Sequence, residues 1–478
     1  MHQIDTNSLK EQFKHCQDIH FQTYLFQATN VTLITCEAMI DKYSLNEIIV
    51  PRLQTICSDP DTQLTEDLLL QNLYLPDLQQ ITDLNDAVSN VFGGFVLIYV
   101  EKLQTLFASN IEKKPNRSPE ETKLEVQIKG PRDNFIEDLA TNIALIRKRL
   151  PTNSLAVEKQ TIGERSKTKL AILYFQDIAD LAILKEIKQD LQSVHTDVLL
   201  SSESLMERFH KQSYFVPLND TTGRPDFAVM ALSAGRFVIL VDGVSYAVIT
   251  PINLLMLLKA GEDIDYPAVT TSIERVLRIF SILIALLLPA FWLALTTFHQ
   301  EQIPFPLLAT IVQANTGLPL PSAIEMLGML FMFELFREAG LRLPSVLGGS
   351  ISVVGGLIIG DAAIRSGITS PAMIVVIAIS TIATFTLVNQ SLVTTVSMIR
   401  VCFIIATSIF GLFGLFLSIY LVILYLANLR VYGVPYLNFT ANLSWANLKV
   451  TLFRPPIQFY KNRTEMNTLK DKTKEGDS

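Results

Sequence analysis

The sequence lacks the short motifs that mark the common enzyme classes. It contains no glycine-rich loop ending in Gly-Lys-Ser/Thr, no GxGxxG, no HExxH and no GxSxG. These motifs are typical of nucleotide-binding proteins, zinc hydrolases and α/β-hydrolases. None of the six histidines stands at a metal-ligand spacing. We therefore predict that the protein is not an enzyme and that it holds no metal and no cofactor.

Cysteine and clustered positive charge are also scarce. The four cysteines, Cys16, Cys36, Cys57 and Cys402, form no CxxC pair, which predicts free thiols in a reducing compartment. The net charge is −7 and no block of Lys and Arg occurs, so we expect no nucleic-acid partner. Residues 1–17 are polar and lack an apolar signal region, which predicts that the soluble domain stays in the cytosol.

Long hydrophobic runs are absent from the first 270 residues and abundant after Arg278. Four stretches contain no Lys, Arg, Asp or Glu: Ile279–Phe298, Leu343–Gly360, Ser366–Ile399 and Val401–Leu429. A helix needs roughly 20 apolar residues to cross the ~30 Å hydrocarbon core of a bilayer. The sequence therefore predicts a soluble domain followed by an all-α polytopic membrane domain. This arrangement favours a receptor, channel or transport subunit.

The soluble domain has the mixed pattern of a two-lobed α/β domain. We expect a mostly helical first lobe over residues 1–112 with a strand at Phe95–Val100, then a polar linker that opens the second lobe, residues 113–270. In the second lobe the pattern predicts a helix over Asn134–Leu150. Further predicted elements are strands at Leu124–Ile128, Lys169–Phe175, Arg236–Val241 and Tyr246–Thr250, and a helix at Ile183–Ser193. The last two strands flank Asp242-Gly243, a hairpin signal.

The predicted membrane domain covers residues 271–435 and is followed by a polar tail, residues 436–478. Arg275 and Arg278 precede the first span, Ile279–Phe298, which places its start on the cytoplasmic side. Further apolar segments are Phe305–Pro321, short and Pro-broken, then Ile324–Phe336, Val346–Ala363, Pro371–Val388 and Val401–Leu429. Five crossings would leave the basic tail outside. Either one of the segments is re-entrant, or Val401–Leu429 is bent.

Several ionisable residues lie on or beside these apolar helices. Glu325 and Glu334 are candidates for an ion path, because charges at membrane depth mark ion paths or internal pairs. Structural ion pairs at the membrane surface are the other interpretation, and they are favoured for Arg337 and Glu338. Asp361 and Arg365, spaced i,i+4, are also predicted to form a structural pair.

Small residues gather between residues 348 and 360. Gly348, Gly349, Gly355, Gly356 and Gly360 predict close helix packing. It would occur either within one subunit or around a symmetry axis where Val354 or Ile358 forms an apolar constriction. The soluble domain contains two polar turns, Gly130-Pro131 and Arg224-Pro225-Asp226. They are candidates for hinges between the lobes or for corners of an interface, and the other interpretation is that they are ordinary loops.

Several longer segments resemble a known family. They are KGPRDNFIEDLATNIALIRKRL from Lys129, GRPD from Gly223, GRFVILVDG from Gly235, and PFPLLATIVQANTGLPLPSAIEMLGMLFMFELFREAGLRLP from Pro304, followed by GGSISVVGGLIIGDAAI. The run EAGLRLP is quite specific. Together these segments, in order from about residue 125 to 435, are similar to the A subunit of the GerA-type spore germinant receptors. Lys129 stands where this family is expected to have Arg.

The resemblance implies a receptor subunit in the spore inner membrane, with the soluble domain facing the spore core. Its partners would be a transporter-like B subunit, which binds the nutrient, and a lipoprotein C subunit. The resemblance also implies self-oligomerisation into a nutrient-gated channel for monovalent cations, surrounded by membrane lipid. A stand-alone secondary transporter and a non-conducting scaffold or signalling subunit remain as alternatives. The transporter normally requires matched inverted repeats, and the sequence has only one Pro/Gly-broken segment, Phe305–Pro321.

Overall fold

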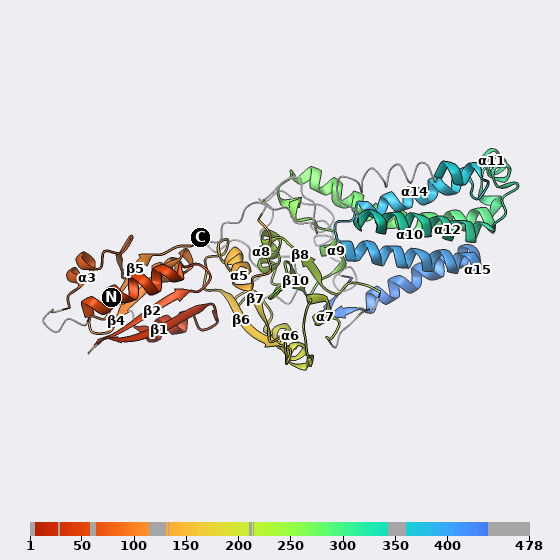
Figure 1. The fold of residues 1–478 in the computed structure, drawn as a ribbon. Coiled ribbons are helices and arrows are strands. Elements are labelled where there is room, and N and C mark those ends of the chain that lie inside the picture. The colour runs from red at the N-terminus through yellow and green to blue at the C-terminus, as the bar shows by residue number, and fades with distance from the viewer. Residues whose placement is uncertain are drawn as a thin grey trace. The chain divides into compact units, whose positions relative to one another are not determined.

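The computed structural model describes residues 5–26, 29–57, 64–113, 131, 133–209, 213, 215–342 and 360–437 of the chain. These residues form two compact units (Figure 1). The first unit takes the described residues up to 209 together with Asn219–Pro251. The second takes Ser213–Leu218 and the residues from Ile252 to 437. The first unit is a mixture of helices and strands, whereas the second is mainly helical.

The N-terminal lobe of the first unit is built on a five-stranded antiparallel sheet in the order β1-β2-β4-β5-β3. Its strands are β1 (Ile19–Phe26), β2 (Thr29–Cys36), β3 (Gln79–Ile81), β4 (Phe95–Val100) and β5 (Thr105–Asn110). Its helices are α1 (Thr6–Gln12), the π-helical η1 (Ser44–Ile49), α2 (Val50–Cys57), α3 (Glu66–Asn72) and α4 (Leu84–Gly93).

This sheet corrects the prediction of a mostly helical lobe over residues 1–112. β4 is predicted correctly because it is one continuous apolar run. Polar residues interrupt β1 at positions 20, 22 and 23 and β2 at positions 30, 32 and 35, so that neither is a continuous apolar run. Their pairing over eight residues, from Ile19 opposite Cys36 to Phe26 opposite Thr29, follows from tertiary packing as well as from local sequence.

The second lobe contains another five-stranded antiparallel sheet, in the order β6-β7-β9-β10-β8. Its strands are β6 (Leu155–Ile162), β7 (Thr168–Phe175), β8 (Asp220–Thr222), β9 (Phe237–Val241) and β10 (Ala247–Thr250). Its helices are α5 (Leu139–Arg147), α6 (Leu181–Ser193), α7 (Ser202–Met206) and α8 (Pro225–Ser233). α5 starts later than predicted because Asp138 caps it, accepting a hydrogen bond from the Thr141 N–H. The predicted strand Leu124–Ile128 lies outside the described residues.

The two lobes repeat one order of elements. Each lobe begins with a helix and a hairpin of two eight-residue strands. There follow, in order, two or more helices, a three-residue strand, one more helix and a second hairpin. The strands also meet in the same order, with the three-residue strand paired to the last strand at one edge of the sheet. The same chain plan therefore occurs twice within the first unit.

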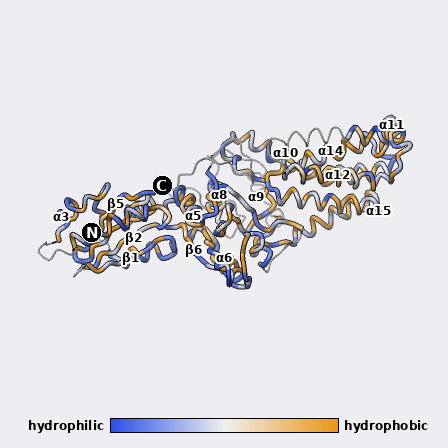
Figure 2. The backbone as a smooth tube through the Cα atoms, in the orientation of Figure 1, coloured by the Kyte–Doolittle hydropathy of each residue, from blue (hydrophilic) through white to orange (hydrophobic). Residues whose placement is uncertain are grey.

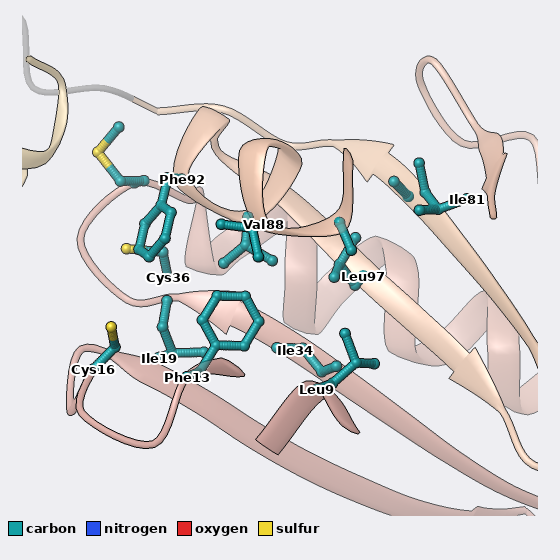
Figure 3. Packing of buried hydrophobic residues seen from close by; sticks show 14 of the residues in the cluster. Leu9, Phe13, Cys16, Ile19, Ile34, Cys36, Ile81, Val88, Phe92 and Leu97 are labelled. Carbon is teal, nitrogen blue, oxygen red and sulfur yellow. The ribbon is translucent and has the colours of Figure 1, made fainter. Parts of the chain in front are cut away.

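Helices cover both faces of the N-terminal sheet. Successive strand residues point to opposite faces, so Leu97 of β4 joins the core beside α1 and α4. Its neighbours Val96 and Ile98 join the core beside α2 and α3. In the first of these cores Phe13 and Phe92 pack edge to face, with ring centroids 5.8 Å apart (Figure 3). Each face of the sheet therefore has its own apolar core.

The second unit is mainly apolar (Figure 2). Its long helices are α10 (Ala268–Thr297), α12 (Ser322–Arg342), α14 (Pro371–Phe385) and α15 (Gln390–Asn428). The shorter elements are α9 (Leu254–Leu257), η2 (Gly261–Ile264), η3 (Gln300–Gln302), α11 (Phe305–Asn315) and the paired strands β11 (Arg430–Val431) and β12 (Val434–Pro435). Among the described residues, α10 and α15 are long and apolar enough to cross a membrane, judged by length and composition alone. Most of the predicted segment Val346–Ala363 lies outside the described residues.

α15 is a helical hairpin and not a straight rod. Gly411 has φ 60° and ψ −141°, a region of backbone space that is nearly exclusive to glycine. A Cβ on Gly414 would collide with the carbonyl oxygen of Ala406, although eight residues of a straight helix span about 12 Å. Residues 390–410 and 412–428 therefore fold back on each other, as the blue ribbon shows in Figure 1.

The hairpin returns the chain to the beginning of the second unit. The carbonyl of Tyr436 accepts a hydrogen bond from the Leu254 N–H at 3.1 Å. At the other end of the bundle, a Cβ on Gly411 would lie 3.0 Å from Cγ of Phe298, the residue directly after α10. The start of α10 and the end of α15 thus lie at one end of the bundle. From the sequence, a bend in Val401–Leu429 was one of two ways in which the basic tail could lie on the cytoplasmic side. The turn at Gly411 is such a bend.

Candidate functional site

The beginning of α10 is held by a buried carboxylate. Asp263 in η2 accepts hydrogen bonds from Arg275 Nε at 3.0 Å and Arg278 Nη1 at 2.9 Å. Arg278 also donates to the carbonyl of Leu258, and the Thr271 hydroxyl donates to the carbonyl of Asp263. All three charged side chains are buried. The two arginines predicted to start the first span therefore face inward, and they tie α10 to the segment that precedes it.

Glu325 caps the start of α14. Its side chain is buried, and Oε1 accepts hydrogen bonds from the Thr369 hydroxyl at 2.7 Å and the Ser370 N–H at 2.8 Å. Ser370 is the N-cap residue of α14, where the helix dipole stabilises a negative charge. This carboxylate therefore joins the first turn of α12 to the first turn of α14. Its predicted place on an ion path stays a prediction.

Glu334 lies between two arginines in the middle of the bundle. Its Oε1 pairs with Arg337, one turn along α12, and its Oε2 lies 3.9 Å from Nη2 of Arg400 in α15. The side chain of Arg400 is only 1% exposed, that of Arg337 14% and that of Glu334 34%. The predicted ion-path residue Glu334 thus has two cationic partners within its own chain.

Arg400 is a site residue that the sequence reasoning missed. A lone charge between the apolar runs Ser366–Ile399 and Val401–Leu429 is typical of a loop between two spans. In the structure Arg400 lies well inside α15 and is almost completely buried. The signal that identifies it is the absence of Gly, Pro or a second charge beside it, since a loop normally carries such residues.

The remaining predicted residues of the helical unit lie apart from this cluster. Asp361 and Arg365 form an exposed ion pair, 2.8 Å long. Glu338 is exposed on α12. Gly360 is buried, and a Cβ built on it would meet no heavy atom of the described residues within 4 Å. Six predicted residues lie outside the described residues: Gly348, Gly349, Val354, Gly355, Gly356 and Ile358.

The polar turn Arg224-Pro225-Asp226 is the start of α8. The buried Arg224 guanidinium pairs with both carboxylate oxygens of Asp226, with a distance of 3.0 Å from Nε to Oδ1. Pro225 occupies the first helical turn, where its missing N–H costs nothing. The contacts are those of a closed helix start, and its predicted role as a hinge or interface stays a prediction. Pro131 is exposed, and Gly130 lies outside the described residues.

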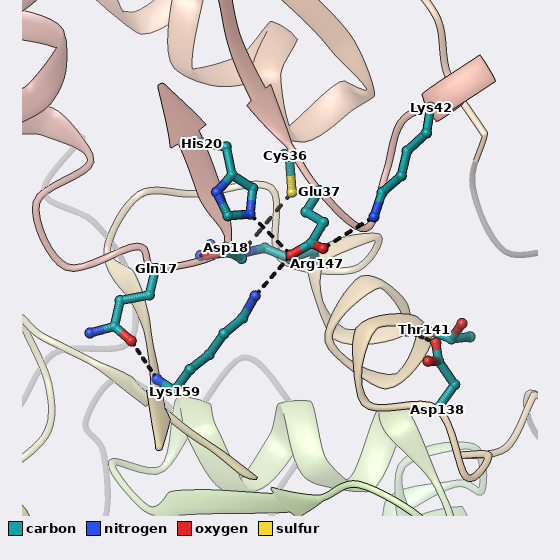
Figure 4. A network of polar contacts seen from close by, with 10 residues as sticks. All are labelled: Gln17, Asp18, His20, Cys36, Glu37, Lys42, Asp138, Thr141, Arg147 and Lys159. Atoms are coloured by element: carbon teal, nitrogen blue, oxygen red, sulfur yellow. Dashed lines mark hydrogen bonds and ion pairs between the residues drawn. The ribbon is translucent and has the colours of Figure 1, made fainter. Parts of the chain in front are cut away.

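A buried ion pair joins the two lobes of the first unit (Figure 4). Arg147, the last residue of α5, donates from Nε and Nη2 to the two carboxylate oxygens of Asp18, at 2.8 and 3.0 Å. The third nitrogen, Nη1, donates to the carbonyl of Thr152. The two side chains are 0% and 1% exposed, and the guanidinium lies 4.2 Å from the centroid of the Phe92 ring. No local spacing links residues 129 apart, so the sequence could not reveal this contact.

Further contacts between the lobes surround that pair. The Gln17 N–H donates to the carbonyl of Val157, and the Val157 N–H donates to the carbonyl of His15, which adds a short strand to the edge of β6. Glu37 accepts from His20 and from Lys159 of β6, each at 3.0 Å. Hydrogen bonds from His20 and then Lys159 lower the pKa of the Glu37 carboxyl to about 2.

Among the residues that the structure describes, no group of three His, Cys, Asp or Glu side chains is placed to hold a metal ion. The chain instead combines a two-lobed α/β unit with an apolar helical bundle that has charged residues in its interior. This combination is typical of receptor and transport subunits.

The comparisons with known proteins agree with this class. The family described as Bacillus/Clostridium GerA spore germination protein matches residues 7–466. The chain is 37% identical over 482 residues to Spore germination protein XA of Bacillus anthracis, covering 99% of this chain and 97% of that protein. It is 34% identical over 449 residues to Spore germination protein KA of Bacillus subtilis (strain 168), covering 94% and 82%. The chain therefore belongs to the GerA spore germination protein family.

One solved structure is also similar. It is the crystal structure of the N-terminal domain of the A subunit of the Bacillus megaterium spore germinant receptor GerK3, with 21% sequence identity and a TM-score of 0.39. The alignment covers 51% of this chain and 92% of that chain.

Proposed function

We propose that the chain is the A subunit of a nutrient germinant receptor in the spore inner membrane. Several copies would assemble into a pore for monovalent cations that opens when nutrient binds. The observation that carries the proposal is the family match over residues 7–466, which includes both the two-lobed unit and the apolar bundle. The charged residues inside the bundle support a role in ion movement, because such residues are costly in a membrane and usually functional.

The bundle geometry supports a membrane orientation with the start of α10 and the end of α15 on the same side. The halves of α15 on either side of Gly411 are roughly 31 and 25 Å long at about 1.5 Å per residue, close to the hydrocarbon thickness. Arg275 and Arg278 mark the start of α10 as the cytoplasmic end. The end of α15 then lies on that side, the spore core, and the positive charge of Arg454, Lys461 and Arg463 in the sequence that follows favours the same side.

The partners follow from the family. A transporter-like B subunit would bind the nutrient, a lipoprotein C subunit would complete the receptor, and further copies of this chain would surround the pore. In this assignment the A subunit is not an enzyme and needs no cofactor. Its contribution is the pore and the two-lobed domain in the spore core.

The test is ion release from liposomes that contain the receptor purified with its B and C subunits. We expect potassium or sodium release that depends on an amino acid or nucleoside nutrient. Glu325→Gln keeps the size of the side chain and removes its charge. Reduced release from a normally assembled Glu325→Gln receptor would place this carboxylate on the ion path.

Glu301→Gln is the matched control, because Glu301 is an exposed residue of η3 and pairs only with His299 among the described residues. This variant should conduct normally. If an assembled receptor shows no nutrient-dependent release at all, the channel proposal is wrong. The subunit would then be a scaffold that signals to a separate channel.

A further inference from the structure

Glu334, Arg337 and Arg400, the charge triad, are linked to all four long helices of the bundle. Arg400 Nη1 donates to the hydroxyl of Ser380 in α14 at 3.0 Å, and this hydroxyl donates to the carbonyl of Ala285 in α10 at 2.9 Å. Together with Glu334 in α12 and Arg400 in α15, these contacts form one polar chain through the apolar interior. Such a chain fixes the relative positions of the helices.

The charge triad lies near the middle of the helices. Ser380 and Glu334 are nine and twelve residues from the starts of α14 and α12, and Arg400 and Ala285 are ten and twelve residues from residue 410 and the end of α10. At about 1.5 Å per residue these spacings are roughly 14–18 Å. If the bundle spans a bilayer of ~30 Å, the charges lie close to its midplane, where an unbalanced contact is most costly.

The contacts of the charge triad are incomplete. The Nε atoms of Arg337 and Arg400 are both buried, and neither has a hydrogen-bond partner among the described residues. A guanidinium has five N–H donors and pairs best with a carboxylate through two parallel bonds. Glu334 pairs closely with Arg337 and only loosely, at 3.9 Å, with Arg400. One carboxylate is thus shared between two cations and satisfies neither fully.

This sharing allows two arrangements. With Glu334 on Arg337, the ion pair lies within α12, and α12 contacts α15 through the hydrogen bond that Arg337 Nη1 donates to the Ser397 hydroxyl at 3.3 Å. With Glu334 turned to Arg400, the pair joins α12 to α15 and satisfies more of the Arg400 donors. A contact with two discrete arrangements is the kind of element that ligand binding can bias.

We propose that Glu334 is the positioning residue that switches between Arg337 and Arg400 during gating, and so sets how firmly α12 is held to α15. The proposal rests on the receptor function proposed above. It gives each arginine an opposite effect. Loss of Arg337 transfers the carboxylate to Arg400 and strengthens the ionic link between α12 and α15, which outweighs the lost hydrogen bond from Arg337 to Ser397. Loss of Arg400 abolishes this ionic link.

The test uses spores that carry the complete receptor with Arg337→Gln, Arg400→Gln or Glu334→Gln in this chain. Receptor level is measured by immunoblot, and the nutrient concentration for half-maximal germination is measured for each strain. We expect Arg337→Gln and Arg400→Gln to shift this concentration in opposite directions, by roughly five- to 150-fold, the usual range of coupling between sites. Glu334→Gln should follow Arg400→Gln, because both remove the link.

Arg365→Gln is the control, because the Asp361–Arg365 pair is exposed and lies outside the triad; it should leave the concentration unchanged. Shifts in the same direction, or no shift at normal receptor level, would overturn the proposal. If Arg400→Gln spores lack receptor, Arg400→Lys keeps the charge without the planar fork. Loss of receptor in both strains would assign the triad to folding and also overturn it. Germination in spores does not require that this subunit conducts, so failure here is separate from failure of ion release in liposomes.

Discussion

Replacement of Arg147 by Met should loosen the contact between the two lobes. The change leaves the Asp18 carboxylate buried, 1% exposed, without the two hydrogen bonds that neutralise it. Removing one partner of such a pair costs about 3–5 kcal/mol, because the remaining charge cannot reach water. About 1.4 kcal/mol is a factor of ten in an equilibrium constant. The lobes should therefore separate roughly 10²–10³·⁵ times more often.

Two thiols beside the pair report that separation. Cys16 and Cys36 are buried there, and burial raises the pKa of both thiols, so they should react slowly with a maleimide reagent in the native protein. In the purified receptor, Arg147→Met should increase their labelling rates by the factor above. Mass spectrometry of the peptides reads each thiol separately. Cys57 belongs to the core on the other face of the sheet and is the internal control.

A double variant separates charge from packing. Arg147→Met combined with Asp18→Val removes both charges and keeps an apolar contact with the Phe92 ring, so its labelling rates should return most of the way to those of the native protein. If Arg147→Met labels Cys16 and Cys36 at the native rate, the ion pair does not hold the lobes together and the reasoning is wrong.

Three further changes should have measurable effects. The lowered pKa of Glu37 contributes stability above pH 4.5, and this stability is lost as the pH falls towards 2. Glu37→Gln should therefore reduce the fall in thermal unfolding temperature between pH 4.5 and 2. An unchanged dependence of that temperature on pH would contradict the assignment. Gly414→Ala places a Cβ against the Ala406 carbonyl and should open the hairpin of α15, lowering receptor level in spores; a normal level would show that the turn adapts. Asp263→Asn leaves Arg275 and Arg278 without their buried counter-charge. Trypsin should therefore cleave after these two arginines faster than in the native receptor. Equal cleavage rates would argue against the contact.

The sequence predicts those regions of the fold that a local pattern defines. β4 and β9 are uninterrupted apolar runs, and β7 is apolar after Lys169. The turn at Asp242-Gly243 joins β9 to β10 as its residue types indicate. α10, α12 and α14 are also predicted from the sequence, because each contains an apolar stretch long enough to form a helix of several turns. In each case neighbouring residues carry the signal, so burial can be inferred without knowledge of the partner.

The remaining features depend on residues far apart in the chain. The Asp18–Arg147 pair and the contact of Glu334 with Arg400 join elements that no spacing connects. The turn at Gly411 is hidden because its neighbours on both sides are apolar, and hydropathy is the same for one long helix and for two that fold back. For Glu325, sequence identifies a buried charge correctly but cannot supply its partner, the start of α14.

The join between the two lobes has a mechanical consequence. Two-lobed domains often close around a ligand by a rotation of one lobe about a hinge. Here any change in the angle between the sheets would strain the hydrogen bonds that Gln17 and Val157 share at the edge of β6, and would pull Arg147 from Asp18. The two lobes of the first unit should therefore move together as one rigid body, so that a force applied to the N-terminal lobe is transmitted to the second lobe.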